Sequence, residues 1–347
     1  MTDDDRAADR MNLVWKRYDL QLRHVFRIAR GARTTVPVMI LELHHDGIIG
    51  YGEASPIKRY GESPETIEEF FRKINLAPFE SPMALENILQ YVNTIAEGNS
   101  SAKCAVDLAL HDWIGKKLAV PLYRLWGLDP EKTPLSSFTI AIDSKEVVEQ
   151  KVREGEHYPI LKVKVGLEND EEMITTIRSV TDKVLYVDAN EGWTDKHVAL
   201  ERITWLKDHN VAFVEQPMPA GQFDDLKWLR DRSALPLIAD ESVLRLSDIP
   251  ALAEAFDGIN IKLMKSTGLH EAMRMIEAAR ALNMKVMLGC MIETAVGISA
   301  AAHLSPLADF ADLDGNVLIS NDPFDGVRNI NGRLQLRNTP GLGVTPV

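Results

Sequence analysis

Cysteine is nearly absent from this sequence, and long apolar runs are missing altogether. Only Cys104 and Cys290 occur among 347 residues, both in apolar surroundings, which argues against a disulfide framework. No apolar run reaches the length of a transmembrane helix, and the acidic start, MTDDDRAADRMNL, lacks the apolar core of a secretory signal. We therefore expect a cytoplasmic protein whose residues 1–11 form a disordered lead-in, with Met11 as an alternative start to Met1.

Positive charge is also in short supply. The chain has 39 Lys and Arg against 51 Asp and Glu, a net charge of −12, which argues against nucleic acid or an anionic membrane as the main partner. Hydrophobic residues make up 45% and charged residues 26%, as in an ordinary globular protein. Because 347 residues exceed the usual size of a single core, one large and one smaller domain are expected.

The N-terminal third alternates between strand and helix signals. Strand-like runs fill residues 12–53, with a hairpin signal at Asp46-Gly47. Helical spacing follows over 64–98 and, rich in Ala and Leu, over 101–117. Strands followed by helices predict an α+β domain over residues 12–130.

From residue 131 to 320 the pattern is a repeated alternation of strand and helix. The predicted strands are SFTIAI, ILKVKV, VLYVDAN, VAFVEQP, PLIADES, GINIKLM, KVMLGCM and ADFADLD. Eight parallel βα units predict an α/β barrel of the TIM type. An open doubly wound sheet is the alternative, although no G-x-G-x-x-G follows the first strand. We expect the remaining segment, residues 321–347, to return to the first domain.

Two lysines stand inside one apolar strand, PILKVKVG. Strand side chains alternate, so Lys162 and Lys164 point to the same face. An edge strand with one solvated face is the simplest explanation. However, polar residues also end other predicted strands, and the first five are spaced 22 to 27 residues apart, about one βα unit each: Lys164, Asp188, Glu215, Asp240 and Lys262, followed by Asp312 and Asp314. In a barrel these positions meet at one mouth, where active sites lie.

Three of these residues are carboxylates from consecutive strands. Asp188, Glu215 and Asp240 offer the hard oxygen ligands that suit Mg²⁺. Helix N-caps and a salt bridge are the alternative explanation. Zn²⁺ is disfavoured because no His or Cys belongs to the group.

The flanking lysines suggest proton transfer. Lys164 and Lys262 should face each other across a ligand bound to the metal, each able to serve as a base. Lys162 should lend a neighbouring positive charge that lowers the pKa of Lys164 and helps to neutralise a developing anion.

With these residues the chain resembles the enolase superfamily, and within it the muconate-lactonizing subgroup, whose K-x-K and later Lys correspond to Lys162, Lys164 and Lys262. The resemblance implies a modified TIM barrel, (β/α)7β, capped by an α+β domain built from the N-terminal segment and the C-terminal tail. It also implies Mg²⁺ and a lysine that removes a proton next to a carboxylate, giving an enolate. The seventh predicted strand, VMLGCM, lacks the His of the mandelate-racemase branch.

The segment ADLDG is similar to the D-x-D of the dipeptide epimerases. The resemblance implies that Asp312 and Asp314 bind the α-ammonium group of a dipeptide. It further implies that Thr139, Cys290 and Ile292 line the substrate site, with Cys290 as a packing residue.

Two stretches, FRIARGART and SPIKRYGES, resemble the cap loops of the L-Ala-D/L-Glu epimerases. An arginine there suits a glutamyl carboxylate. Arg33 is the first candidate, followed by Arg30 and then Arg59.

The resemblance therefore implies a Mg²⁺-dependent dipeptide epimerase, an isomerase that inverts the C-terminal residue of a dipeptide such as L-Ala-D/L-Glu from murein. Its ligand would be a small dipeptide, and we expect a homo-oligomer. A cycloisomerase or an o-succinylbenzoate synthase is the alternative within the superfamily. A Schiff-base lysine aldolase and a non-catalytic binding protein are alternatives from other classes.

Overall fold

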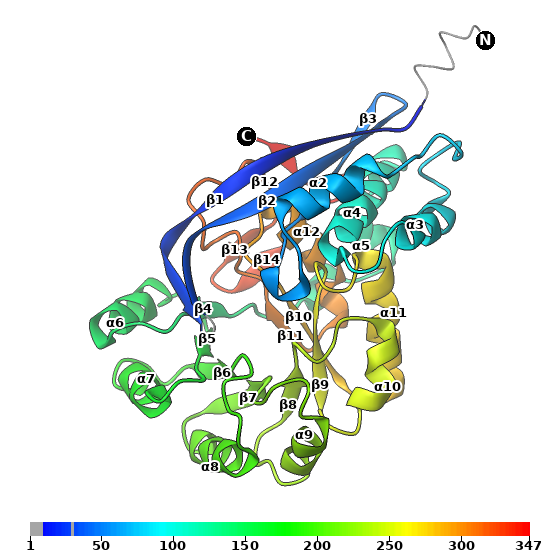
Figure 1. The fold of residues 1–347 in the computed structure, drawn as a ribbon. Helices are drawn as coiled ribbons and strands as arrows, with labels where there is room; N and C mark the ends of the chain where they lie inside the picture. The colour runs from blue at the N-terminus through cyan, green and yellow to red at the C-terminus, as the bar shows by residue number, and fades with distance from the viewer. Residues whose placement is uncertain (1–9, 29–30) are drawn as a thin grey trace, which may run out of the picture.

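The computed structural model describes residues 10–28 and 31–347. Most of the predicted lead-in (residues 1–9) and the candidate Arg30 lie outside these ranges. Within them a three-stranded sheet with helices caps one end of a barrel (Figure 1). No helix in the part of the chain described here combines the length and apolar character needed to cross a membrane.

The cap sheet is antiparallel, in the order β1 (Asn12–Ile28), β2 (Gly31–His45), β3 (Ile48–Ala54). The predicted hairpin at Asp46-Gly47 is confirmed, with φ of 50° and 68°, the left-handed values that a tight hairpin turn needs. Helix α4 (Ser100–Lys117) crosses β3 closely, because a Cβ at Gly52 would lie 1.8 Å from the Ala105 carbonyl oxygen.

The helical pattern over 64–98 forms two helices. They are α2 (Pro64–Arg72) and α3 (Leu85–Thr94). Ser63 caps α2 in a reciprocal pair with Thr66. Pro78 and Pro82 lie between the helices, where each removes a backbone donor and prevents one continuous helix. Another short helix, α5 (Leu122–Leu125), leads towards the barrel.

All eight predicted barrel strands are confirmed, and each pairs in parallel with its neighbours in chain order. They are β4 (Phe138–Ile140), β5 (Ile160–Lys164), β6 (Val184–Asp188), β7 (Val211–Glu215), β8 (Leu237–Ala239), β9 (Gly258–Lys262), β10 (Lys285–Gly289) and β11 (Phe310–Asp312). A parallel bridge between Ser136 and Ala311 joins the last strand to the first. The sheet therefore closes, and the open doubly wound alternative is wrong.

Each of the first seven barrel strands is followed by a helix. These are α6 (Lys145–Glu154), α7 (Asp170–Arg178), α8 (Lys196–Lys207), α9 (Phe223–Arg230), α10 (Ile249–Leu252), α11 (Leu269–Ala281) and α12 (Ala295–Leu304). Short 3-10 helices are Lys58–Tyr60, Pro130–Lys132, Leu246–Asp248 and Ser305–Leu307. The predicted (β/α)7β barrel with its cap is thus confirmed.

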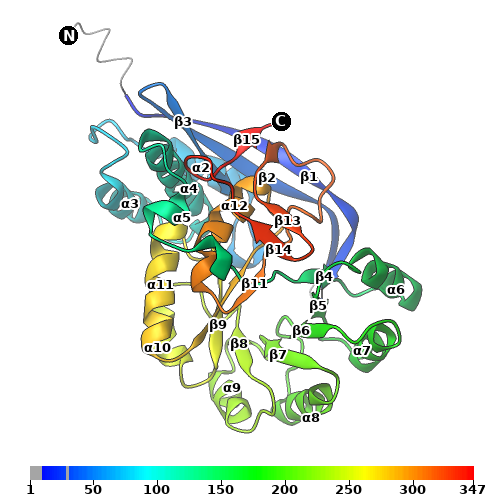
Figure 2. The same ribbon diagram turned by 180° about the vertical axis from the view of Figure 1, so that it is seen from behind.

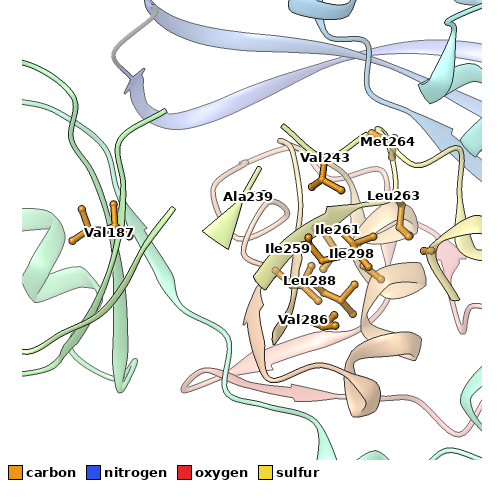
Figure 3. Close-up of a cluster of buried hydrophobic side chains, with 14 of the residues drawn as sticks. Val187, Ala239, Val243, Ile259, Ile261, Leu263, Met264, Val286, Leu288 and Ile298 are labelled. Atoms are coloured by element: carbon orange, nitrogen blue, oxygen red, sulfur yellow. The ribbon is translucent and has the colours of Figure 1, made fainter. Parts of the chain in front are cut away.

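Strand alternation divides the core into two parts. Outward side chains such as Ile259, Ile261 and Leu288 form one apolar cluster with Ile298 of α12 (Figure 3). Inward residues form a small apolar layer inside the barrel, made of Tyr186, Phe213, Ile238 and Met287. Further along the same inward faces, towards the cap, the residues are polar.

The two lysines of β5 belong to that inward face. β5 pairs with β4 on one side and with β6 on the other, so it is no edge strand. The edge-strand explanation is therefore wrong: Lys162 and Lys164 point into the barrel and are buried.

The C-terminal segment forms small hairpin pairs and contacts the cap. Its strands are β12 (Phe324–Asp325), β13 (Arg328–Ile330), β14 (Arg333–Gln335) and β15 (Thr345–Pro346). Asp112 of α4 accepts a hydrogen bond from the Leu342 amide at 2.8 Å, and the chain end lies beside the cap sheet (Figure 2). The predicted domain boundaries, 130/131 and 320/321, stay predictions.

Candidate active site

A cavity of about 880 Å³, part of it open to solvent, lies between the carboxyl ends of the barrel strands and the cap. Most of the residues singled out in the sequence line it: Thr139, Lys164, Asp240, Lys262, Cys290, Ile292, Asp312 and Asp314 from the barrel, and Arg33 and Arg59 from the cap. Asp188, Glu215 and Lys162 lie buried beside these residues. The structure thus brings together side chains that are up to 281 positions apart, from Arg33 to Asp314.

The three carboxylates of β6, β7 and β8 converge. Asp188, Glu215 and Asp240 each offer an oxygen, and these atoms lie within 4.8 Å of one another. Their side chains are almost inaccessible, with 0%, 0% and 3% of each residue exposed. A set of three carboxylate oxygens without nitrogen or sulfur fits a hard cation such as Mg²⁺. Helix capping does not account for the group, because in the described chain none of the three accepts a bond from a helix N-terminus in the manner of a cap.

Two side-chain amides that the sequence analysis did not single out contact the triad, one at a carboxylate and one at the backbone. Asn260 Nδ2 donates to Glu215 Oε1 at 2.8 Å, and Gln216 Oε1 accepts from the backbone amide of Asp240 at 3.0 Å. Asn260 stands two residues before Lys262 on β9, so strand alternation could have placed it on the same inward face.

Burial and neighbouring lysines act in opposite directions on the pKa values of the three carboxyl groups. Burial would raise the pKa of Asp188 and of Asp240, but neighbouring lysines hold both well below the usual range. Burial and the charge of Asp188 raise the pKa of Glu215 to about 7. A bound divalent cation would favour the ionised form of all three.

Lys164 and Lys262 stand on opposite sides of the barrel, because β5 and β9 are separated by three strands in either direction. Lys164 Nζ lies 2.6 Å from Asp188 Oδ2, and Lys262 Nζ lies 2.8 Å from Asp240 Oδ2. Burial opposes the charge of Lys262, yet the carboxylates, Asp240 first, raise its pKa above the usual value.

Lys162 differs from its expected role. Its ammonium group lies 2.7 Å from Glu215 Oε2, 2.7 Å from Asp312 Oδ2 and 3.2 Å from Asp188 Oδ2. These carboxylates overcome the effect of burial and raise the pKa of Lys162. It is therefore a compensated cation that links the triad to Asp312, and not a free positive charge beside Lys164.

Lys265 is a residue of the site that the sequence analysis did not single out. It lies in the turn after β9, fully buried, with Nζ 2.6 Å from Asp240 Oδ1 and 2.5 Å from the Asp240 carbonyl oxygen. Burial lowers its pKa. The only signal in the sequence is a lysine inside an otherwise apolar and small segment, LMKSTG.

The aspartate pair after β11 is held by the first barrel strand. Asp312 Oδ1 accepts from Ser137 Oγ, and Asp314 Oδ2 accepts from the Thr139 amide, both at 2.7 Å. Burial and the charge of Asp312 raise the pKa of Asp314 to about 7. A cationic ligand beside the pair would offset this repulsion. The Cys290 thiol donates to the Asp312 carbonyl oxygen at 3.2 Å, and burial raises its pKa, so it has the properties of a packing residue.

The cap arginines differ in how they are engaged. Arg33 is exposed at the cavity wall. Arg59 forms a two-pronged ion pair with Glu191, at 2.7 and 2.5 Å, and so ties the cap to the loop after β6. Arg33 therefore has the freer guanidinium group of the two.

Two buried carboxyl groups, one from the cap and one from the barrel, lie where the cap packs on the barrel. Glu53 of β3 accepts bonds from the backbone of Thr294 and Gly297 at the start of α12, at 2.8 and 2.9 Å. Glu293 accepts from the Met291 amide at 2.7 Å. A Cβ at Gly297 would lie 2.2 Å from a Glu293 oxygen and 3.1 Å from a Glu53 oxygen, so both groups share one small space.

The burial of Glu53 and Glu293 predicts that the stability of the folded protein depends on pH. Burial raises the pKa of Glu53 to about 7 and of Glu293 to about 8. The ordinary pKa of a glutamate is 4.5, so between pH 4.5 and about 8 the folded protein binds more protons at these two groups than the unfolded chain does. The free energy of unfolding should therefore fall as the pH rises through this range, by up to about 1.4 kcal/mol per pH unit for each group. Glu293→Gln should therefore unfold at a higher temperature than the parent at pH 8.5 and show a smaller gain at pH 5. A lower unfolding temperature at pH 8.5 would contradict this account.

Comparison with known proteins identifies the family of this chain and agrees with its fold. Residues 13–127 match the N-terminal domain of the mandelate racemase/muconate lactonizing enzyme family, and residues 143–347 match the enolase C-terminal domain-like family. An L-Ala-D/L-Glu epimerase of Bacteroides thetaiotaomicron is 51% identical over 97% of this chain and 88% of its own length.

Two solved structures are also similar. A substrate-liganded L-Ala-D/L-Glu epimerase from Bacillus subtilis superposes with a TM-score of 0.91 at 29% identity, covering 97% of this chain and 99% of that one. A dipeptide epimerase from Enterococcus faecalis, complexed with Mg and L-Leu-L-Tyr, gives a TM-score of 0.89 at 32% identity, with the same two coverages.

Proposed function

Because this chain belongs to the mandelate racemase/muconate lactonizing enzyme family of the enolase superfamily, we propose that it is a Mg²⁺-dependent dipeptide epimerase acting on L-Ala-D/L-Glu. The observation that carries the proposal is the placement of Lys164 and Lys262 on opposite sides of a buried carboxylate triad, beside an aspartate pair. Relatives that act on this dipeptide support the choice of substrate.

Epimerisation needs an acid/base group on each face of the carbon that is inverted. Asp188, Glu215 and Asp240 would hold Mg²⁺, which supplies positive charge to the substrate carboxylate and makes the neighbouring carbon more acidic. Lys164 takes the α-proton from one face and Lys262 returns a proton to the other, with the roles exchanged in the reverse direction. Lys162 and Lys265 keep the surrounding carboxylates paired.

Asp312 and Asp314 would bind the α-ammonium group of the dipeptide. Hydrogen bonds from Ser137 and Thr139 fix both carboxylates at the cavity wall, and charge-assisted bonds to an ammonium group are strong. A cycloisomerase or an o-succinylbenzoate synthase has no need for such an anionic pair. N-Acetyl-L-Ala-L-Glu, which lacks the ammonium group, should therefore not be turned over.

The proposed activity can be tested by incubating the protein with Mg²⁺ and a panel of dipeptides in deuterated water. Incorporation of deuterium at the α-carbon of the C-terminal residue, with both epimers formed, is expected for L-Ala-L-Glu. Full activity in excess chelator, together with covalent trapping of a lysine by borohydride, would instead identify the Schiff-base aldolase.

Side-chain selection should depend on Arg33. Its guanidinium group is exposed at the cap wall of the cavity, and a lost charged hydrogen bond costs about 1.5–3 kcal/mol. Arg33→Met should lower kcat/KM for L-Ala-L-Glu by about tenfold or more and improve L-Ala-L-Met relative to it. Arg72→Met, on the exposed side of α2 and outside the cavity lining, is the matched control. An unchanged preference for the glutamyl residue in Arg33→Met would remove Arg33 from this role.

We further propose a cytoplasmic location, which two free cysteines support. The homo-oligomeric state stays a prediction, to be checked by light scattering in solution.

A further inference from the structure

A second cavity, also of about 880 Å³ and partly open to solvent, adjoins the catalytic one. Phe26, Thr139 and Leu318 line both. The rest of its wall comes from the cap hairpin, from β4 and α6, and from the segment after β11, and it is mostly apolar, with Phe138 and Tyr158 in ring contact at 5.0 Å. Nothing in the proposed proton transfer uses this space.

A bulge in the cap hairpin forms the roof. The pairing of β1 with β2 shifts register between Gln21 and Phe26, so residues 22–25 leave the regular sheet. The Arg23 amide instead donates to the Leu318 carbonyl oxygen at 2.9 Å. Figure 1 shows the hairpin reaching from the cap down to β4. Bulges often redirect side chains next to active sites, and here one closes a cavity over the barrel rim.

The wall of this cavity contains a buried cation without a hydrogen bond. Lys151 of α6 has 5% of its side chain exposed, and its Nζ has no hydrogen-bond partner among the described residues. Asp143 Oδ2 lies 3.6 Å away, too far for a hydrogen bond. An ammonium group has three donors, and leaving them unused in a buried place is costly. The cavity therefore offers donors to an oxygen atom of a ligand.

Charge indicates which kind of oxygen. Glu154 also lines the cavity, where His24 Nε2 lies 2.8 Å from its carboxylate. Asp143 also lies near Lys151. A carboxylate of a ligand in this cavity would therefore be repelled by the carboxylates of Asp143 and Glu154. A neutral carbonyl oxygen accepts from Lys151 without that repulsion.

The connection between the cavities lies at the aspartate pair. Thr139 lines both cavities, and its backbone amide donates a hydrogen bond to Asp314. Burial and the charge of Asp314 raise the pKa of Tyr158, on the far side, to about 12. Because Thr139 contacts Asp314 and lines both cavities, a dipeptide whose ammonium group contacts Asp312 and Asp314 would have its N-terminal residue next to the second cavity.

We propose, on the basis of the proposed function, that the second cavity is the subsite for the side chain of the N-terminal residue. It accepts an apolar stem that ends in a neutral carbonyl oxygen, as in glutamine, and Lys151 donates to that oxygen. The substrates then include dipeptides with an N-terminal residue well above alanine in size.

The test compares freshly dissolved L-Gln-L-Glu with L-Met-L-Glu, which has a similar length but no carbonyl acceptor, and with L-Ala-L-Glu. The parent should prefer the glutaminyl over the methionyl dipeptide. Lys151→Met should lower the ratio of their kcat/KM values by about tenfold, mainly through KM, because one charged hydrogen bond is lost. Lys145→Met, an exposed lysine on the same helix, should leave the ratio unchanged.

Thermal unfolding separates this role from a structural one. Lys151→Met replaces a buried ammonium group by an apolar chain of similar length and leaves Asp143, its partly exposed ion-pair partner, to solvent, so the unfolding temperature should stay close to that of the parent. Turnover of L-Ala-L-Glu without turnover of L-Gln-L-Glu, or an equal effect of Lys151→Met on all three dipeptides, would overturn the subsite and leave the epimerase standing. Lack of turnover with every dipeptide would overturn the proposed function and the subsite with it.

Discussion

Replacing either Lys164 or Lys262 with alanine is expected to abolish net epimerisation, by about 1,000-fold or more, because each lysine is the only proposed proton carrier on its side of the substrate. The two ammonium groups approach the cavity from strands on opposite sides of the barrel. Each single variant should still exchange the α-proton of one epimer with deuterated solvent, and the two variants should differ in which epimer they exchange.

The measurement is deuterium incorporation into L-Ala-L-Glu and L-Ala-D-Glu, followed separately by NMR. Lys145→Ala, an exposed lysine on α6, is the matched control and should retain the parent rate. Exchange of the same epimer by both active-site variants would show that the lysines do not serve opposite faces. Loss of fold is excluded by comparing thermal unfolding of each variant with the parent.

The triad gives the second large effect. Asp188→Asn, Glu215→Gln and Asp240→Asn each keep the size of the side chain but remove one anionic ligand. Each should weaken Mg²⁺ binding by about 100-fold or more and remove nearly all activity. Glu215→Gln should disturb the fold least, because Asn260 donates to Glu215 Oε1 and an amide oxygen can accept the same bond.

Calorimetric titration with Mg²⁺ checks this result without relying on turnover. Asp224→Asn, an exposed residue in the first turn of α9, serves as the control. Parent-like Mg²⁺ affinity together with normal turnover in any one triad variant would remove that residue from the metal site. Addition of a chelator to the parent should abolish activity reversibly.

Local periodicity was sufficient for the elements and for much of the site. Alternation within a strand placed Lys162 and Lys164 on one face, and a spacing of one βα unit placed Asp188, Glu215 and Asp240 at equivalent strand ends. These inferences hold because side-chain direction in a strand and the geometry of a βα unit are local properties. The helical spacing over residues 64–98 is confirmed as two helices, with Pro78 and Pro82 between them.

The partners of each charge depended on the closed barrel. Lys162 contacts carboxylates from β6, β7 and β11, and Lys265 folds back from a turn onto Asp240. Neither pairing can be predicted from the local sequence, because the groups come into contact only when distant strands converge in the barrel. The same holds for Arg59, which pairs with Glu191, and for Lys151, whose ammonium group has no hydrogen-bond partner among residues 10–28 and 31–347.

The sequence by itself determined the barrel, the three candidate metal ligands and the two candidate bases, since each depends on a period that a strand or βα unit imposes on its own residues. Only the tertiary structure decided which cations are neutralised, which arginine is exposed to the cavity and where a second cavity opens. Those features depend on distances between segments that the chain separates by tens to hundreds of residues, and burial then sets how much each unpaired charge costs.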